Sequence, residues 1–279
     1  MKKYFKLFML MLLVFSYSYA GVMPETDWKV KKLDGKVKSM IKTEYEYDSS
    51  GKLEKTRLTE TYFNEQGYIT DEVQYVDNRL NQSIIYKNNS DGLPIKKDEV
   101  SRRYSYKYEE TKDGNLLVTI KEEYVDKKNF PSLEKITYNK NGKKVHHLVY
   151  SGEELITNDT YIYNKKGNLI EIKDNTFPEN SMKITYNYKA NGDYEKTTDV
   201  ATAKWTYLYD KNGNEKEYIS MIKQGSQGKP KISIYLKFKD ITRDEYGNLT
   251  RNTSVRYDYS KKKESSIYKK LENKYEYYK

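Results

Sequence analysis

Cysteine is absent from this chain of 279 residues. No disulfide can therefore brace the fold, and the chain is not a bacterial lipoprotein, because the acylated anchor of that class is a cysteine. Proline is scarce, with five residues, and histidine scarcer, with two. No apolar run after Ala20 reaches the roughly 20 residues that a spanning helix needs, so the sequence predicts no transmembrane helix in the mature chain.

The first 20 residues have the pattern of a cleaved signal peptide. A basic start with three lysines precedes an apolar run from Leu7 to Phe15, and Ala20 ends a site of small residues. This apolar run is too short to cross a bilayer and to remain as an anchor. We therefore expect residues 1–20 to be removed and residues 21–279 to form a single β-repeat domain, periplasmic or secreted.

Charge is plentiful but not one-sided. Lys and Arg number 51 and Asp and Glu number 41, and the formal net charge is +10. Lysines alternate with glutamates instead of forming a basic block, which predicts a solvated mixed-charge surface and no nucleic-acid partner. So polar a composition otherwise indicates disorder, but 31 tyrosines supply large side chains that a fold can half-bury.

One short pattern recurs along the chain: aromatic, any residue, aromatic, Asp or Asn, two polar residues, Gly, a polar residue, then Leu or Ile. Clear copies begin at Tyr45, Tyr161 and Tyr207, and degenerate copies begin at Tyr62, Thr137, Tyr186 and Asp244. Such self-similarity is typical of a repeat architecture.

Each position of the pattern has a physical reason. Side chains two residues apart lie on one face of a strand. The Asp or Asn accepts a backbone N–H and starts the turn, and the glycine takes the positive φ that closes it. Every copy predicts one hairpin tip, and the expected turn residues are Asp48, Gly51, Gly67, Asn139, Gly142, Asn164, Gly167, Gly192, Asp210, Gly213 and Gly247.

These tips predict an all-β fold of about 16 to 20 short antiparallel strands, with helix scarce. An isolated hairpin is not stable in water, so consecutive hairpins are expected to join edge to edge into one long twisted meander of degenerate hairpin repeats. The sequence leaves three forms of that meander open: a curled open sheet, a closed barrel and a two-layer sandwich.

The repeat resembles the YD repeats of RHS and teneurin-type proteins, and Leu33 to Ser39 with Asp244 to Leu249 is similar to small exported RHS-repeat-like proteins of bacteria. Tyr138 to Lys143 also resembles the MORN-like repeats of antitoxin-type hairpin proteins. In the RHS family, β-hairpins form shells around a cargo or toxin, and some members bind sugar or protein ligands. This chain is far shorter than those shells and lacks their Asp-Pro dipeptide, so the resemblance implies the architecture alone.

Residues suited to catalysis or metal binding are few. His146 and His147 are adjacent, so they face opposite sides of a strand and cannot clasp one metal together. Asp210 to Asn214 begins like a calcium loop, but Met221 occupies the place of the loop's glutamate. No nucleophile elbow or carboxylate pair has an assignable role. The sequence predicts no catalytic residue, no cofactor and no metal, and hence a protein that is not an enzyme.

Tyrosine is the residue type with binding potential. Aromatic rings can stack on sugars or anchor a protein partner. Cross-strand aromatic ladders that hold a meander together are the stronger explanation, and the two roles are compatible. The candidate binding face consists of Tyr45, Tyr47, Tyr161, Tyr163, Trp205, Tyr207 and Tyr209.

Together these features predict an exported, non-catalytic β-repeat protein at the cell envelope, either structural or binding an unknown envelope protein or glycan. The alternatives are an outer-membrane β-barrel and, less favoured, a secreted hydrolase. Two observations count against the membrane barrel: Tyr194 to Val200 has no apolar face for lipid, and the chain ends in Lys279 instead of an aromatic residue.

Overall fold

The computed structural model describes residues 22–125, 131–223, 231–258 and 261–279. The predicted signal peptide, residues 1–20, lies outside the described residues.

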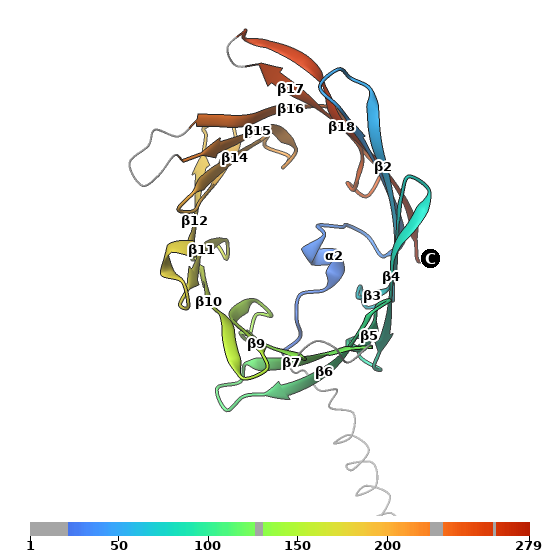
Figure 1. The fold of residues 1–279 in the computed structure, drawn as a ribbon, viewed down its shortest axis with the longest axis vertical. Helices are drawn as coiled ribbons and strands as arrows, with labels where there is room; N and C mark the ends of the chain where they lie inside the picture. Colours follow the sequence, from blue (N-terminus) through green and yellow to red (C-terminus); the bar gives the residue numbers. More distant parts are fainter. Residues whose placement is uncertain (1–21, 126–130, 224–230, 259–260) are drawn as a thin grey trace, which may run out of the picture.

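The described strands form one closed, antiparallel up-and-down barrel (Figure 1). Each strand pairs with its neighbours in sequence, and β1 pairs with β18 to close the ring. The predicted all-β meander is confirmed, and the closed barrel is the form that it takes. The strands are β1 (Val37–Tyr47), β2 (Leu53–Phe63), β3 (Ile69–Val76), β4 (Arg79–Asn88), β5 (Pro94–Asp98), β6 (Arg102–Glu110), β7 (Leu116–Tyr124), β8 (Ser132–Tyr138), β9 (Lys144–Ser151), β10 (Glu154–Tyr163), β11 (Leu169–Asp174), β12 (Met182–Tyr188), β13 (Tyr194–Asp199), β14 (Ala203–Tyr209), β15 (Glu215–Ile222), β16 (Lys231–Arg243), β17 (Leu249–Asp258) and β18 (Lys263–Tyr277).

Two short helices accompany the described strands, α2 (Asp27–Val30) and the 3-10 turn η1 (Pro178–Asn180). α2 belongs to residues 22–36, which run inside the ring of strands (Figure 1). We call residues 22–36 the strap.

The repeated turns gather at one end of the barrel, because alternate connections of a meander lie at the same end. This turn end also holds the start of β1 and the end of β18. Gly51, between β1 and β2, belongs to the opposite end, which we call the loop end. The glycines of the turn end are Gly67, Gly92, Gly114, Gly142, Gly167, Gly192, Gly213 and Gly247, all at positive φ.

The strap is bonded to the turn end near β2 and β3. The Trp28 backbone N–H donates to Gly67 O at 3.2 Å, and its indole N–H donates to Val37 O at 2.8 Å. Asp27 accepts the backbone N–H of Ile69 at 2.8 Å. The one buried apolar cluster recorded in the described chain lies here, with Val37, Met40 and Phe63 packed against Trp28, Leu33, Ile69, Tyr275 and Tyr277.

A second attachment joins the strap to the β16–β17 turn. Asn248 is 1% exposed. Its side-chain oxygen accepts the Asp34 N–H at 2.7 Å, and its amide nitrogen donates to Asp34 O and to the Tyr277 hydroxyl, each at 2.7 Å. The strap is thereby held on two separate parts of the ring.

The strap also shows which side chains face the interior. Met40 lines a cavity together with Lys31 and Lys32 of the strap, so Met40 faces inward. Side chains alternate along a strand, and residues paired across strands share a face. Lys42 and Glu44 therefore face inward with Met40, and the outward side of β1 carries Ile41, Thr43, Tyr45 and Tyr47.

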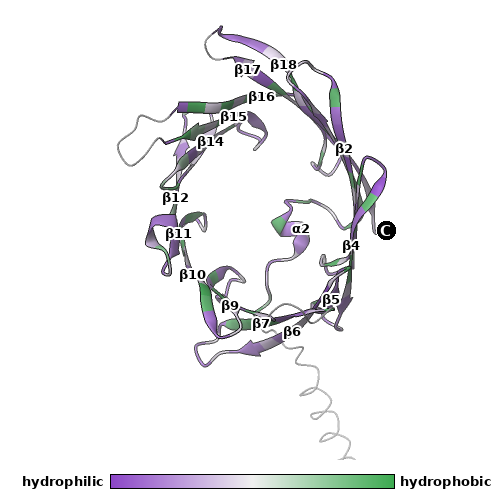
Figure 2. Ribbon diagram, in the orientation of Figure 1, coloured by the Kyte–Doolittle hydropathy of each residue, from purple (hydrophilic) through white to green (hydrophobic). Residues whose placement is uncertain are grey.

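Much of the outer wall is polar. The outward side of β6 carries Arg103, Ser105, Lys107 and Glu109, and that of β13 carries Glu195, Thr197 and Asp199. Hydrophilic residues run through the strands all round the ring (Figure 2). The barrel thus combines a mixed-charge exterior with an interior rich in tyrosine.

Candidate functional site

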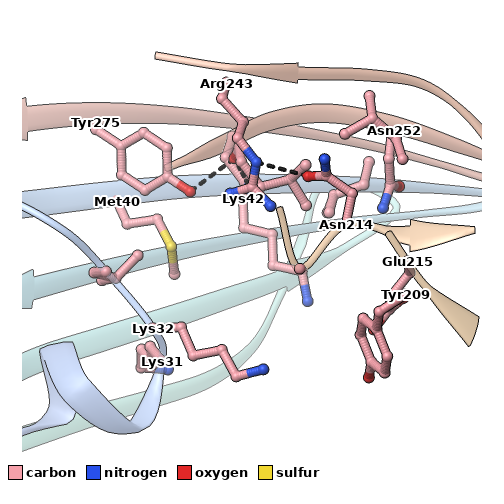
Figure 3. A pocket seen from close by; sticks show the side chains of 16 residues that line it. Lys31, Lys32, Met40, Lys42, Tyr209, Asn214, Glu215, Arg243, Asn252 and Tyr275 are labelled. Carbon is pink, nitrogen blue, oxygen red and sulfur yellow. Dashed lines mark hydrogen bonds between the residues drawn. The ribbon is translucent and has the colours of Figure 1, made fainter. Parts of the chain in front are cut away.

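A cavity of about 460 Å³ lies between the strap and the inner wall at the turn end (Figure 3). This volume is typical of a small-molecule site. Residues far apart in sequence meet here because ring closure brings β1 and β18 beside β16 and β17. The cavity is lined by Lys31, Lys32, Leu33, Met40, Lys42, Tyr209, Gly213, Asn214, Glu215, Ile241, Arg243, Leu249, Asn252, Leu271, Asn273 and Tyr275.

Positive charge predominates in the lining, with four cationic side chains and the single carboxylate of Glu215. Two of the cations have partners: Lys42 lies 3.1 Å from Glu44, and Lys31 lies 3.9 Å from Glu72. Lys32 and Arg243 differ from them, since no carboxylate of the described residues lies within 4.0 Å of either charged group. The cavity therefore holds two cations without a close carboxylate partner, and Glu215 is the acidic group of the lining that opposes their charge.

Arg243 is held in place by neutral groups. Its Nε donates to the side-chain oxygen of Asn214 at 2.7 Å, and Nη1 donates to Gly247 O at 2.5 Å. Figure 3 shows the side chains of Lys32, Lys42 and Arg243 turned into the same space. The guanidinium keeps donors free because it carries five N–H groups.

Glu215 shares the site with two lysines. Burial raises the pKa of Glu215, while the charges of Lys32 and Lys196 act against this rise. Burial also lowers the pKa of Lys196, and the neighbouring Lys32 adds to that effect. Burial raises the pKa of Tyr275 to about 12, so its phenol is protonated at neutral pH.

An aromatic ladder runs across the inner wall from β12 to β15 beside this cavity. Ring centroids are 5.6 Å apart for Tyr188 and Tyr194, and 4.6 Å for Tyr194 and Tyr209. They are 6.1 Å apart for Tyr209 and Tyr207, and 4.8 Å for Tyr207 and Tyr218. Because the rings lie face against face in the Tyr194–Tyr209 pair, at an interplanar angle of 11°, this part of the ladder stabilises the wall.

The structure divides the tyrosines of the candidate binding face between the two sides of the wall. Tyr209 lines the cavity beside Lys32, so Tyr209, Tyr207 and Trp205 face inward. Tyr45 and Tyr47 face outward. The seven residues therefore do not form one surface.

Tyr161 and Tyr163 also belong to the interior. Tyr108 lines a pocket with Met23 of the strap. Residues paired across neighbouring strands lie on the same face of the sheet. Four successive pairs lead from Tyr108 on β6 to β10, through Val118, Ile136, His147 and Asp159. Alternation then places the two tyrosines on the same side as Asp159.

The turn residues take part in a recurring arrangement. At the first turn, Asp48 Oδ1 accepts the backbone N–H groups of Ser50 at 2.8 Å and Lys52 at 3.0 Å, and Gly51 has a φ of 86°. Asn139, Asn164 and Asp210 accept equivalent bonds. The Asp210 carboxylate also accepts a bond from the Asn214 side chain, so turn contacts already occupy the start of the calcium-like segment.

The two histidines lie on opposite faces of β9. His146 bonds to Asn158 at 2.9 Å on the outside. On the inside, His147 Nε2 lies 3.3 Å from Glu134, and Nδ1 lies 4.0 Å from Asp159. Within the described residues, no group of three His, Cys, Asp or Glu side chains is arranged to hold a metal ion.

Sequence reasoning missed Lys32 and Arg243 as candidate site residues. Each is one cation among 51 in the chain, and they lie more than 200 positions apart. One local signal did exist: Arg243 directly precedes Asp244 of a repeat, where the other copies have an aromatic residue, tyrosine in all but one. Its inward direction could have been inferred once the ends of the barrel were known.

A scan against protein-family models and a search of the curated proteins found no match. Among solved structures, a porin-like protein from Bacteroides uniformis matches with a TM-score of 0.50 and 12% identity, covering 92% of this chain and 100% of that chain. A structure of TcdB2-TccC3 overlaps at a TM-score of 0.27 and 12% identity, covering 80% of this chain and 16% of that chain.

The porin-like match concerns the fold alone at this level of identity. It agrees with the closed antiparallel barrel that the strand pairing of this chain forms. The overlap with TcdB2-TccC3 is too weak to bear on the RHS resemblance, which stays a prediction from the motif. Among the described residues, no helix is long and apolar enough to cross a membrane.

Proposed function

We propose that this chain is a porin-like barrel of the cell envelope that is exported through its leader and holds a ligand inside its ring. The observation that carries this proposal is the division of side chains between the two walls. The strap, the tyrosines of the ladder and the lysines of the cavity lie inside, whereas charged residues such as Lys107 and Glu195 lie outside. The chain then acts by binding, without catalysis.

The outer wall favours water over lipid as its surroundings. A lysine or arginine on the lipid side of a barrel costs about 2–4 kcal/mol near the bilayer midplane. β6 alone would place Arg103 and Lys107 there, and β12 would add Lys183. The outward side of β6 offers no apolar residue in compensation.

Insertion in the outer membrane is the second candidate. The closed ring of antiparallel strands, with both ends of the wall at the turn end, and the porin-like neighbour support it. In that case the Tyr45 and Tyr47 side of β1 would contribute to an aromatic belt.

Cell fractionation with an alkaline carbonate wash tests the two candidates. The water-facing barrel is expected in the periplasm or medium, and the purified mature chain is expected to stay monodisperse without detergent. Retention in the washed outer membrane, together with aggregation without detergent, would replace the first candidate by the second.

A further inference from the structure

We propose that the cavity between the strap and the inner wall is a binding site for a small organic anion that carries a carboxylate or phosphate group. This site would give the barrel of the proposed function its ligand class.

Charge selects an anion. Lys32 and Arg243 face the cavity without a carboxylate partner among the described residues, and Glu215 is the single acidic group of the lining. Positive charges in a confined space raise the local concentration of anions. Glu215 offsets part of this positive charge, and a neutral ligand would leave the remainder uncompensated.

Donor groups select a carboxylate or phosphate. Arginine presents a planar fork that matches two oxygens of such a group, and lysine adds a compact charge. Asn252 adds a side-chain amide to the lining. The Tyr275 hydroxyl already donates its hydrogen bond to Leu249 O at 2.8 Å. Tyr275 therefore forms part of the cavity wall, and the cations are the groups that bind the anion.

The site is assembled from parts that the fold fixes independently. Arg243 is positioned by its hydrogen bonds to Asn214 and Gly247. The backbone position of Lys32 is set by the hydrogen bonds of Trp28 and Asp34, which attach the strap on either side of it. Lys32 has a φ of 55°, in the left-handed region. Its ammonium group lies 6.0 Å from the centroid of the Tyr209 ring and interacts electrostatically with Glu215, but no carboxylate of the described residues lies within 4.0 Å of it, so it remains available to a ligand.

Isothermal titration calorimetry of the mature chain tests the site, with galacturonate as the anionic probe and galactose as its neutral twin. We expect saturable binding of galacturonate and at least about tenfold weaker binding of galactose, because a charged hydrogen bond is lost. Competition by inorganic phosphate would indicate a general anion site. Its failure to compete would assign the site to carboxylates.

Matched variants localise the binding. Lys32→Asn removes the charge and keeps a residue that tolerates a left-handed backbone. It is expected to weaken galacturonate binding about tenfold. Lys107→Asn removes the same charge from the outer wall, where the side chain is 70% exposed, and is expected to leave binding unchanged. Glu215→Gln removes the opposing charge and is expected to strengthen binding.

Three results would overturn the site: no anion binds, galactose binds as well as galacturonate, or the Lys32 and Lys107 variants weaken binding equally. Circular dichroism of each variant shows whether it has folded. These outcomes are independent of location, because membrane retention would refute the water-facing barrel and leave the calorimetry valid.

Discussion

The two ends of the barrel are built from the same hairpin chemistry but differ in what covers them. At the turn end, some of the short glycine turns meet the strap, and Gly67 lies against Trp28. At the loop end, Gly51 has almost the same φ as Gly67, 86° against 87°, yet a Cβ there would meet nothing within 4 Å. The difference shows that a turn motif fixes its own backbone but not its surroundings.

The ends also explain why one copy of the repeat shows its tyrosines to the outside. The chain proceeds round the ring in one direction, whichever end a hairpin lies at. A hairpin at the turn end can therefore be superposed on one at the loop end only by a half-turn about an axis tangent to the barrel wall. This half-turn exchanges the two ends of the barrel and also its inner and outer faces. Tyr47 therefore faces outward, whereas Tyr163 and Tyr209, at the same repeat position, face inward.

The largest effect is expected from removing the strap's main anchor. Trp28→Ala should lower the free energy of unfolding by about 3 kcal/mol, at the low end for a buried aromatic because Trp28 is only half-buried. Phe177→Ala, whose side chain is 49% exposed near the loop end, is the control and should change stability little. Equal midpoints in urea for the two variants would show that the strap does not stabilise the turn end.

A second comparison uses two glycines in the same conformation. Gly67→Ala and Gly51→Ala share the cost of a left-handed alanine, about 1 kcal/mol. Only at Gly67 would the new Cβ approach Trp28 Cε3 to 2.6 Å. We expect Gly67→Ala to destabilise by about 2 kcal/mol more, measured by thermal unfolding. A smaller loss at Gly67 than at Gly51 would contradict the packing of the strap.

The next effect concerns two asparagines at the same repeat position. Asn248→Ala removes three hydrogen bonds from a buried site and should cost about 2 kcal/mol. Asn168→Ala removes an exposed side-chain bond to Tyr188 of 3.2 Å and should cost less than about 1 kcal/mol. Chemical denaturation measures the loss in free energy of unfolding for each variant. Similar losses would mean that Asn248 does not stabilise the attachment of the strap.

The smallest effect is a difference in pH dependence between two inward carboxylates. Burial raises the pKa of Glu215, so the folded chain binds this proton more tightly, and stability falls as pH rises above the ordinary value of 4.5. At Glu44, burial acts against ionisation but Lys42 and Lys269 outweigh it and lower the pKa. That contribution to stability is present above 4.5 and is lost as pH falls through the lowered pKa.

Urea midpoints between about pH 4 and about pH 7 separate these contributions. Relative to the unmodified chain, Glu215→Gln should gain stability as pH rises, and Glu44→Gln should lose it. If both variants follow the unmodified chain in parallel, neither carboxylate has the assigned environment.

The spacing of the glycines in the sequence also predicts which end of the barrel each turn occupies. Gly51 and Gly67 are 16 residues apart, room for one strand, whereas Gly67 and Gly92 are 25 apart, room for two. That spacing alone places Gly51 at the other end of a meander. The outward direction of Tyr45 and Tyr47 was therefore present in the sequence as a count between turns.

Ring closure and the cavity could not be read in the same way. β1 and β18 pair across more than 220 residues, and the strap joins Asp34 to Asn248 at a separation of 214. No local pattern determines such contacts, because each depends on the summed twist of every strand between them. The charges of Lys32 and Arg243 look ordinary until closure places them in one cavity.

The sequence by itself determined the strands, the turns and their antiparallel order, since alternation and turn chemistry act over a few residues. Only the tertiary structure decided that the meander closes, that the strap enters the ring, and which cations lack a partner. Local patterns set the repeat, whereas closure depends on long-range pairing between the first and last strands.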